Sequence, residues 1–169
     1  MRHALDRLYD AAGYLAALFL AGTLAMVLLG IAGRFLYFHV PGTDSYAGYC
    51  MAASGFLALA HTFKRGEHIR VSLVLEHVNE NARRTLERVS LAAATLLAAL
   101  FAYYSIRLAF QSWDFNDVST GNDATPLWIP QLAMAAGTVI LAIALVDELI
   151  LEWRRRRDTA PPSVVTFNE

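Results

Sequence analysis

The sequence predicts an all-α integral membrane protein with four transmembrane helices plus short amphipathic interfacial helices. Of its 169 residues, 56% are hydrophobic and 17% are charged, whereas soluble domains carry about 25% charged residues. The charges are also placed unevenly, and four long stretches contain no Asp, Glu, Lys or Arg. These stretches are 11–33, 45–63, 89–106 and 124–146. A helix needs about 20 apolar residues to cross roughly 30 Å of hydrocarbon, so each stretch can span a bilayer.

Transmembrane spans are accordingly predicted at about 11–33, 45–63, 89–110 and 130–151. They form a single membrane domain over 1–157, followed by a disordered tail over 158–169. A soluble helical bundle would show polar stripes at helical spacing, but the central runs are apolar on every side. Strands of a membrane barrel would alternate apolar and polar residues, and these runs do not alternate.

The distribution of basic residues predicts the orientation of the spans. Segments between successive spans lie on alternate sides of the membrane. Of the 14 Lys and Arg residues, only Arg34 and Arg107 lie in the segments that follow the first and third spans, and the other twelve lie on the opposite side. The side rich in Lys and Arg faces the cytoplasm. Both termini and 64–88 are therefore expected in the cytoplasm, and 34–44 and 107–128 are expected outside, in the periplasm if the cell is Gram-negative. The long first run, followed by further spans, favours an uncleaved anchor over a signal peptide.

Residues at the ends of the spans are predicted to fix their depth in the bilayer. Arg34 can extend its guanidinium to the headgroups. Asp44 follows a Pro-Gly turn and is predicted to cap the second helix. Pro130 suits the first turn of the last span, where its missing N–H is not needed. The expected interfacial anchors are Trp113, Trp128, Pro130, Trp153 and Arg154.

Two amphipathic segments flank the spans. In the first, 3–14, apolar residues recur at helical spacing, which fits either a helix on the inner membrane surface or an extension of the first span. The second lies in 64–88, where a short interfacial helix is predicted. Small residues also recur at every fourth position, a spacing that permits close helix contact. They are Gly13, Ala17 and Ala21; Gly48 and Ala52; Ala94, Ala98 and Ala102; and Ala133 and Gly137.

The chemistry of the spans argues against an autonomous transporter or an enzyme. A transporter that acts alone usually carries an ionisable group or a broken helix at mid-membrane, and here no charged residue lies near the centre of a span. No catalytic constellation, metal-binding spacing or phosphate loop is visible. Only His61 of the five histidines lies near a span, so no haem or other cofactor is predicted. His61 is expected at the interface or bonded to a neighbouring helix.

Three segments resemble the small membrane subunit of tripartite ATP-independent periplasmic (TRAP) transporters. The first is Arg34 at the end of span one. The second is the exit from span two, which reads Lys64-Arg65-Gly66-Glu67-His68-Ile69-Arg70-Val71 and is similar to the family's Arg-x-Gly-x-His-Ile-x-Val. The third is 125–130, which resembles the Pro-Leu-Trp opening of the last span. The Trp and paired Glu that the family often has before span two are replaced here by 42–46, where Asp44 can stand for one acid.

The resemblance implies a scaffold subunit that supports a large elevator-type subunit in sodium-coupled symport of an organic anion, often a carboxylate. It also implies a periplasmic solute receptor as a transient partner, together with membrane lipids and no nucleic acid. The residues expected at lipid or subunit interfaces are Arg34, Asp44, Lys64, Arg65, Glu67, His68 and Arg70. Outer segment 114–128 is the expected surface for the receptor. Two alternatives remain: an independent small permease, and a membrane anchor of a redox complex.

Overall fold

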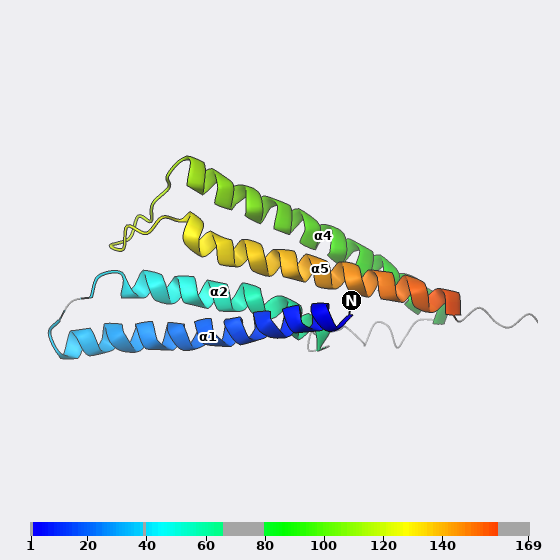
Figure 1. Cartoon of the computed structure of the whole chain (residues 1–169), viewed down its shortest axis with the longest axis horizontal. Helices are drawn as coiled ribbons and strands as arrows, with labels where there is room; N and C mark the ends of the chain where they lie inside the picture. Colours follow the sequence, from blue (N-terminus) through cyan, green and yellow to red (C-terminus); the bar gives the residue numbers. More distant parts are fainter. Residues whose placement is uncertain (1, 39, 66–79, 159–169) are drawn as a thin grey trace, which may run out of the picture.

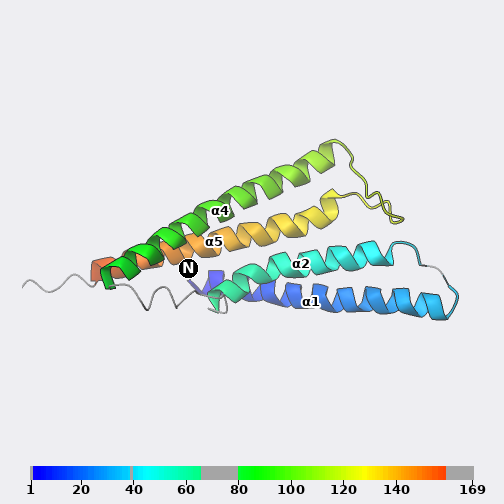
Figure 2. The same cartoon turned by 180° about the vertical axis from the view of Figure 1, so that it is seen from behind.

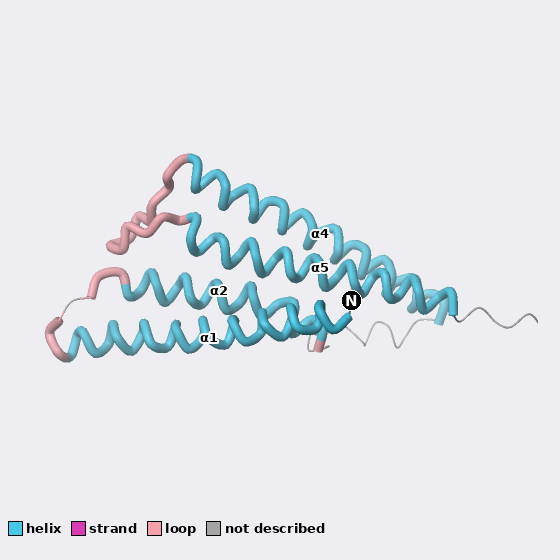
Figure 3. Tube along the Cα trace, in the orientation of Figure 1, coloured by secondary structure: helices cyan, strands magenta, loops and turns pink. Residues whose placement is uncertain are grey.

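The computed structural model describes residues 2–38, 40–65 and 80–158, and this part of the chain forms four helices (Figure 1; Figure 3). They are α1 (Arg2–Phe35), α2 (Thr43–Lys64), α4 (Glu80–Asp114) and α5 (Trp128–Asp158). Within the described residues, β-structure is limited to an isolated bridge between Val118 and Pro126. The predicted all-α fold is confirmed for this part of the chain.

The helices lie in a row rather than around a common centre. α1 packs against α2, α2 against α5, and α5 against α4, while α1 meets α5 only slightly. Figure 1 shows this order, and Figure 2 shows it again from behind. α4 diverges from α5 toward the loop that joins them. α1 and α4 are therefore the outer helices, α2 and α5 are the central ones, and the row has two broad open faces.

Three of the four helices are long and apolar enough to cross a membrane. They are the segments His3–Phe35, Thr85–Asp114 and Trp128–Trp153. Their large apolar side chains point outward: Leu18 of α1 and Leu97 of α4 are both 66% exposed in the isolated chain. Such surfaces are stable only in contact with lipid or with another protein. The chain is therefore a membrane protein with at least three helices suited to span the bilayer.

The second predicted span forms a helix, α2, but α2 is not among the three apolar segments. Its first turn contains polar residues, and hydroxyl side chains recur along it. The central position of α2 accounts for this composition, because much of its surface contacts α1 and α5 instead of lipid. Its 22 residues extend about 33 Å at 1.5 Å per residue, enough to cross roughly 30 Å of hydrocarbon. A fourth crossing by α2 therefore stays a prediction.

Each predicted span lies within one helix. Three of the helices extend beyond their predicted spans, all at the same end of the molecule. α1 begins at Arg2, α4 begins at Glu80 and α5 ends at Asp158. We call this the basic end, and the opposite end the loop end. Charged residues do not stop a helix where the hydrocarbon stops, because their side chains can reach water from a continuing helix. The tail after Asp158 lies outside the described residues.

Of the two expectations for 3–14, the structure shows the extension of the first span. This segment is continuous with α1, and most of its apolar side is turned inward: Tyr9 is 3% exposed and Ala12 is 2% exposed, whereas Leu8 is 37% exposed. Tyr9 forms a buried cluster with Ala60 of α2 and Ala144 of α5, against which Leu5 also packs. The amphipathic pattern therefore reflects helix packing. The second predicted interfacial helix falls mainly within 66–79, outside the described residues.

Small residues allow the central helices to approach closely. A Cβ added to Gly137 of α5 would lie 2.5 Å from the backbone carbon and oxygen of Phe56 in α2, and one added to Gly13 of α1 would lie 2.8 Å from the His61 ring. Gly48 differs, because a Cβ there would meet nothing within 4 Å. The small-residue pattern therefore marks contacts within the chain at Gly13 and Gly137, and an exposed position at Gly48.

Candidate functional site

A lysine at the basic end connects three helices. Lys64 is the last residue of α2, and its Nζ donates hydrogen bonds to Asp147 Oδ2 at 2.6 Å and to Glu148 Oε2 at 3.4 Å, both on α5. The same Nζ lies 5.6 Å from the centre of the Tyr9 ring of α1. The Lys64 and Asp147 side chains are only 20% and 23% exposed. We call Lys64, Tyr9, Asp147 and Glu148 the Lys64 cluster. These residues hold α1, α2 and α5 together.

His61 adds a second contact between α1 and α2, one turn before Lys64. Its Nδ1 lies 3.2 Å from the carbonyl oxygen of Tyr9 and 3.5 Å from Asp10 Oδ1. Gly13 of α1 leaves space for the imidazole ring. Of the two sequence-based expectations for His61, the bond to a neighbouring helix is the one observed. Among the described residues, no group of three His, Cys, Asp or Glu side chains is arranged to bind a metal ion.

The other residues predicted at the basic end do not join the Lys64 cluster. Arg65 is exposed just beyond α2, and its backbone N–H donates to the carbonyl oxygen of His61 at 3.1 Å. Trp153 of α5 is 70% exposed, as expected of an interfacial anchor. A further contact joins α4 to α5, where Arg88 Nε lies 3.9 Å from Glu152 Oε1. Outside the described part lie Glu67, His68, Arg70 and the side chain of Arg154.

At the loop end, one carboxylate attaches the loop before α5 to α2. Tyr49 of α2 donates its hydroxyl to Asp123 Oδ2 at 3.0 Å, and Ser119 donates to Asp123 Oδ1 at 2.9 Å. The hydroxyls of Thr125 and Tyr46 are hydrogen-bonded at 3.0 Å. Partial burial alone would raise the pKa of Asp123, but hydrogen bonds from Thr125, Ser119 and Tyr49 outweigh it and hold the pKa well below the ordinary value of 3.8.

The predicted aromatic anchors at the loop end lie against each other. Trp113 near the end of α4 and Trp128 at the start of α5 have ring centroids 4.8 Å apart and planes inclined by 70°. Trp113 is still 60% exposed, which suits a residue at a membrane interface. Pro130 occupies the first turn of α5, where an N–H would have no helical acceptor. Pro130 therefore lies in the first helical turn, where the sequence placed it, and its role as an interfacial anchor stays a prediction.

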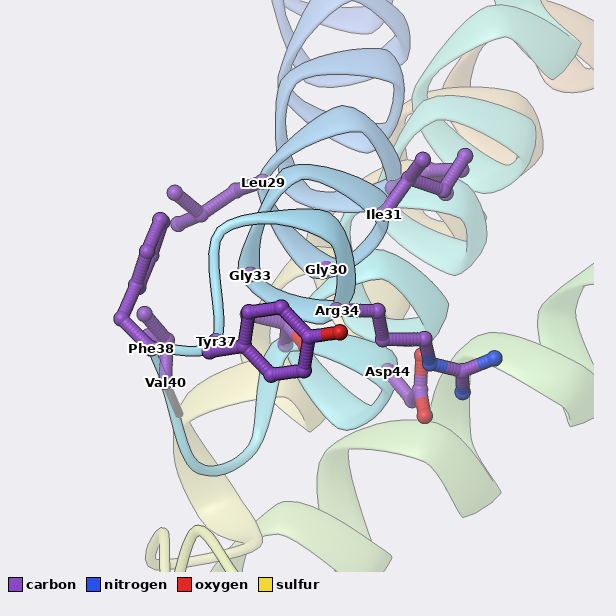
Figure 4. A pocket seen from close by; sticks show the side chains of 11 residues that line it. Leu29, Gly30, Ile31, Gly33, Arg34, Tyr37, Phe38, Val40 and Asp44 are labelled. Carbon is purple, nitrogen blue, oxygen red and sulfur yellow. The ribbon is translucent and has the colours of Figure 1, made fainter.

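Arg34 and Asp44 line one cavity between the end of α1 and the start of α2 (Figure 4). The cavity has a volume of about 440 Å³. Both side chains are exposed, and Figure 4 shows them on the same side of the cavity, next to Tyr37. The predicted capping role of Asp44 is wrong: Gly42, at φ 81°, is the N-cap residue, and no side chain caps α2. Asp44 lies in the first turn instead, because the helix begins at Thr43, directly after the left-handed Gly42.

Comparison with known families decides the family to which the chain belongs. Residues 23–155 match the family described as tripartite ATP-independent periplasmic transporters, DctQ component. The chain belongs to the DctQ family. No match was found among curated proteins. The family predicted from the sequence is therefore confirmed, and it is a family of transporter components, not of enzymes.

The residues that organise this DctQ chain include several that sequence reasoning missed. Asp147 and Glu148 directly follow the uncharged run 124–146, just as Lys64 directly follows the uncharged run 45–63. Charges that close two such runs on the same predicted side must lie at similar depth, and this signal could have predicted their pairing. Asp123 carried no comparable signal, because its partners are hydroxyls distant in sequence.

We expect Asp123→Asn to release the loop of this DctQ chain from α2. A neutral amide is a weaker hydrogen-bond acceptor than a carboxylate, so amide hydrogen exchange in 115–127 should rise several-fold at neutral pH. Asp114→Asn is the matched control, because Asp114 is exposed at the end of α4. Equal exchange in the two variants would contradict the assignment.

The hydrogen bonds to Asp123 also predict how the attachment of the loop depends on pH. Since folding lowers the pKa of Asp123, the carboxylate stabilises the attached loop fully at pH values above 3.8. This stabilisation declines as the pH falls below 3.8 and is lost only after the lower folded-state pKa is passed. Exchange protection of 115–127, corrected for the intrinsic pH dependence, should therefore persist at pH 5 and disappear only in strong acid. Loss between pH 7 and 5 would show that another group attaches the loop.

Proposed function

We propose that this DctQ chain is the scaffold subunit of a TRAP transporter. In this role it supports a large elevator-type membrane subunit during sodium-coupled, receptor-dependent uptake of an organic anion, often a carboxylate. The observation that carries the proposal is the open row of helices. Its buried positions are mostly alanine, whereas large apolar side chains are exposed on both outer helices. A row with two uncovered broad faces suits a brace that lies along a larger membrane protein.

α2 offers the surface on which the large subunit is proposed to pack. Because α2 is flanked by α1 and α5, its exposed residues point out of a broad face of the row. Gly48, Ala52 and Gly55 are exposed and span about two helical turns on one side of α2. A Cβ added to Gly48 or Gly55 would meet nothing within 4 Å. A helix of the large subunit could therefore approach closely at this surface.

The proposal includes an orientation in the bacterial inner membrane. Both ends of the described chain, at Arg2 and Asp158, lie at the basic end with Lys64 (Figure 1). The excess of Lys and Arg on this side supports a cytoplasmic location. The loop end, including 114–128, would then face the periplasm and meet the solute receptor transiently. The attachment of this loop through Asp123 supports such a role, since a fixed surface loses less entropy on binding.

The test is co-purification of the large subunit with leucine variants of the exposed face of α2. Gly48→Leu and Gly55→Leu should leave the chain folded, yet reduce the recovered large subunit by about tenfold, equivalent to 1.4 kcal/mol. Ala99→Leu, an exposed small residue of the outer helix α4, is the matched control. Unchanged recovery with the glycine variants would place the large subunit elsewhere.

The alternative function, an independent small permease, predicts a different result for the purified chain. Liposomes that contain this chain alone should then accumulate organic anions in response to a sodium gradient, without a large subunit. The scaffold proposal expects uptake only when the large subunit is reconstituted with it. Sodium-driven uptake by the chain alone would overturn the scaffold proposal.

A further inference from the structure

The cavity between α1 and α2 has a layered composition. Val27 and Ile31, which are four residues apart on one side of α1, contribute an apolar wall and are 45% and 47% exposed. Leu29 also lines the cavity but points to the other side of α1 (Figure 4). Arg34 and Asp44 line the same cavity beyond this wall, toward the loop end. Its volume of about 440 Å³ falls in the ~300–1,000 Å³ range of small-molecule pockets. Since α1 is an outer helix of the row, the cavity is accessible from the surrounding lipid.

The two charged groups of the cavity have opposite signs and are available. Within the described part of the chain, neither Arg34 nor Asp44 forms an ion pair or a side-chain hydrogen bond. Both side chains line the cavity, and Figure 4 shows them on the same side of the end of α1. A guanidinium is suited to bind a phosphate through two parallel hydrogen bonds. A carboxylate accepts hydrogen bonds and is suited to a primary ammonium group. The pair therefore matches a ligand that carries a phosphate and an amine a short distance apart.

We propose that this cavity binds the headgroup of a zwitterionic, primary-amine phospholipid of the ethanolamine class. Arg34 binds the phosphate, Asp44 binds the ammonium group, and the apolar wall contacts the start of the acyl chains. The aromatic rings of Tyr37 and Phe38 also line the cavity, as expected at headgroup depth. The proposal requires only that the chain lies in a membrane, so it does not depend on the scaffold role.

The chemistry of the pair distinguishes this lipid from the other common classes. A phosphatidylglycerol headgroup would also satisfy Arg34, but it has no cation for Asp44 and its negative charge is repelled there. A phosphatidylcholine headgroup carries a cation, but its methyl groups cannot donate N–H hydrogen bonds to a carboxylate. The ethanolamine headgroup is the one of the three that satisfies both side chains.

The test measures lipid retention by the full chain. The protein is reconstituted in nanodiscs with equal molar amounts of phosphatidylethanolamine, phosphatidylglycerol and phosphatidylcholine, then extracted and analysed by native mass spectrometry. The wild-type chain should retain phosphatidylethanolamine several-fold above the other two. Arg34→Gln should reduce retention of both phosphatidylethanolamine and phosphatidylglycerol. Asp44→Asn should reduce phosphatidylethanolamine and increase phosphatidylglycerol, which reverses the preference.

Two controls separate the site from general lipid binding. Arg107→Gln changes the other arginine predicted on this side of the membrane, which is exposed on α4, and should leave the preference unchanged. Asp44→Glu keeps the carboxylate and should retain most of it. Equal retention of the three lipids by the wild-type chain, or equal effects of Arg107→Gln and Arg34→Gln, would overturn the proposal. So would displacement of the lipid by the large subunit in the purified complex, since the cavity would then be a protein interface.

Discussion

Replacing Gly137 by alanine is expected to destabilise the chain by about 1–3 kcal/mol, the usual cost of overpacking a tight contact. The added Cβ would lie 2.5 Å from the backbone carbon and oxygen of Phe56. Backbone atoms cannot move aside by a change of rotamer, so α2 and α5 would have to separate. This contact joins the α1–α2 pair to the α4–α5 pair, so the whole row should loosen.

Gly48→Ala is the matched control, because it makes the same chemical change on α2 where a Cβ meets nothing within 4 Å. Alanine is the better helix former by about 0.8–1.0 kcal/mol, so this variant should be neutral or more stable. The two variants are therefore predicted to shift stability in opposite directions. The measurement is unfolding of the purified chain in detergent, titrated with sodium dodecyl sulfate and followed by circular dichroism. A stabilised Gly137→Ala variant would contradict the packing of α2 on α5.

Replacing Lys64 by methionine should cost about 2–3 kcal/mol. The substitution leaves the Asp147 and Glu148 carboxylates without the ammonium group that lies 2.6 Å and 3.4 Å away. Loss of one partner from a fully buried pair costs about 3–5 kcal/mol, and this pair retains some contact with water. The contact with the Tyr9 ring of α1 is lost as well, so α1, α2 and α5 should separate more easily at the basic end.

The control for Lys64→Met is Arg65→Met, which removes a neighbouring exposed charge and should change stability by no more than about 0.5 kcal/mol. The double variant Lys64→Met with Asp147→Leu should recover part of the loss, with a coupling energy of about 0.5–3 kcal/mol. Detergent unfolding provides the free energies, and a double-mutant cycle isolates the pair. Equal effects of Lys64→Met and Arg65→Met, or strict additivity in the cycle, would show that the ion pair contributes little.

At the ends of the membrane-spanning helices, the sequence predicted some features correctly and others wrongly, for identifiable reasons. Pro130 was placed correctly because proline in a first turn is a local requirement. Asp44 was given a capping role that Gly42 takes, because the starting residue of a helix depends on the left-handed turn before it. The amphipathic face of 3–14 was compatible with a membrane surface or with neighbouring helices, and the period alone does not distinguish the two. Tyr9 packs against Ala60 and Ala144.

The family and the positions of the four apolar helices along the chain were determined by the sequence alone, whereas α1, α4 and α5 extend beyond the predicted spans. Long uncharged apolar runs can be stable in lipid only as structures that satisfy their own backbone hydrogen bonds, and this requirement is local to each run. Only the tertiary structure decided that the helices form an open row, that Lys64 pairs with Asp147, and that Arg34 and Asp44 share a cavity. Those features depend on side chains that are distant in sequence. Hydropathy along the chain measures the preference of each residue for lipid, and it carries no information on which residues meet.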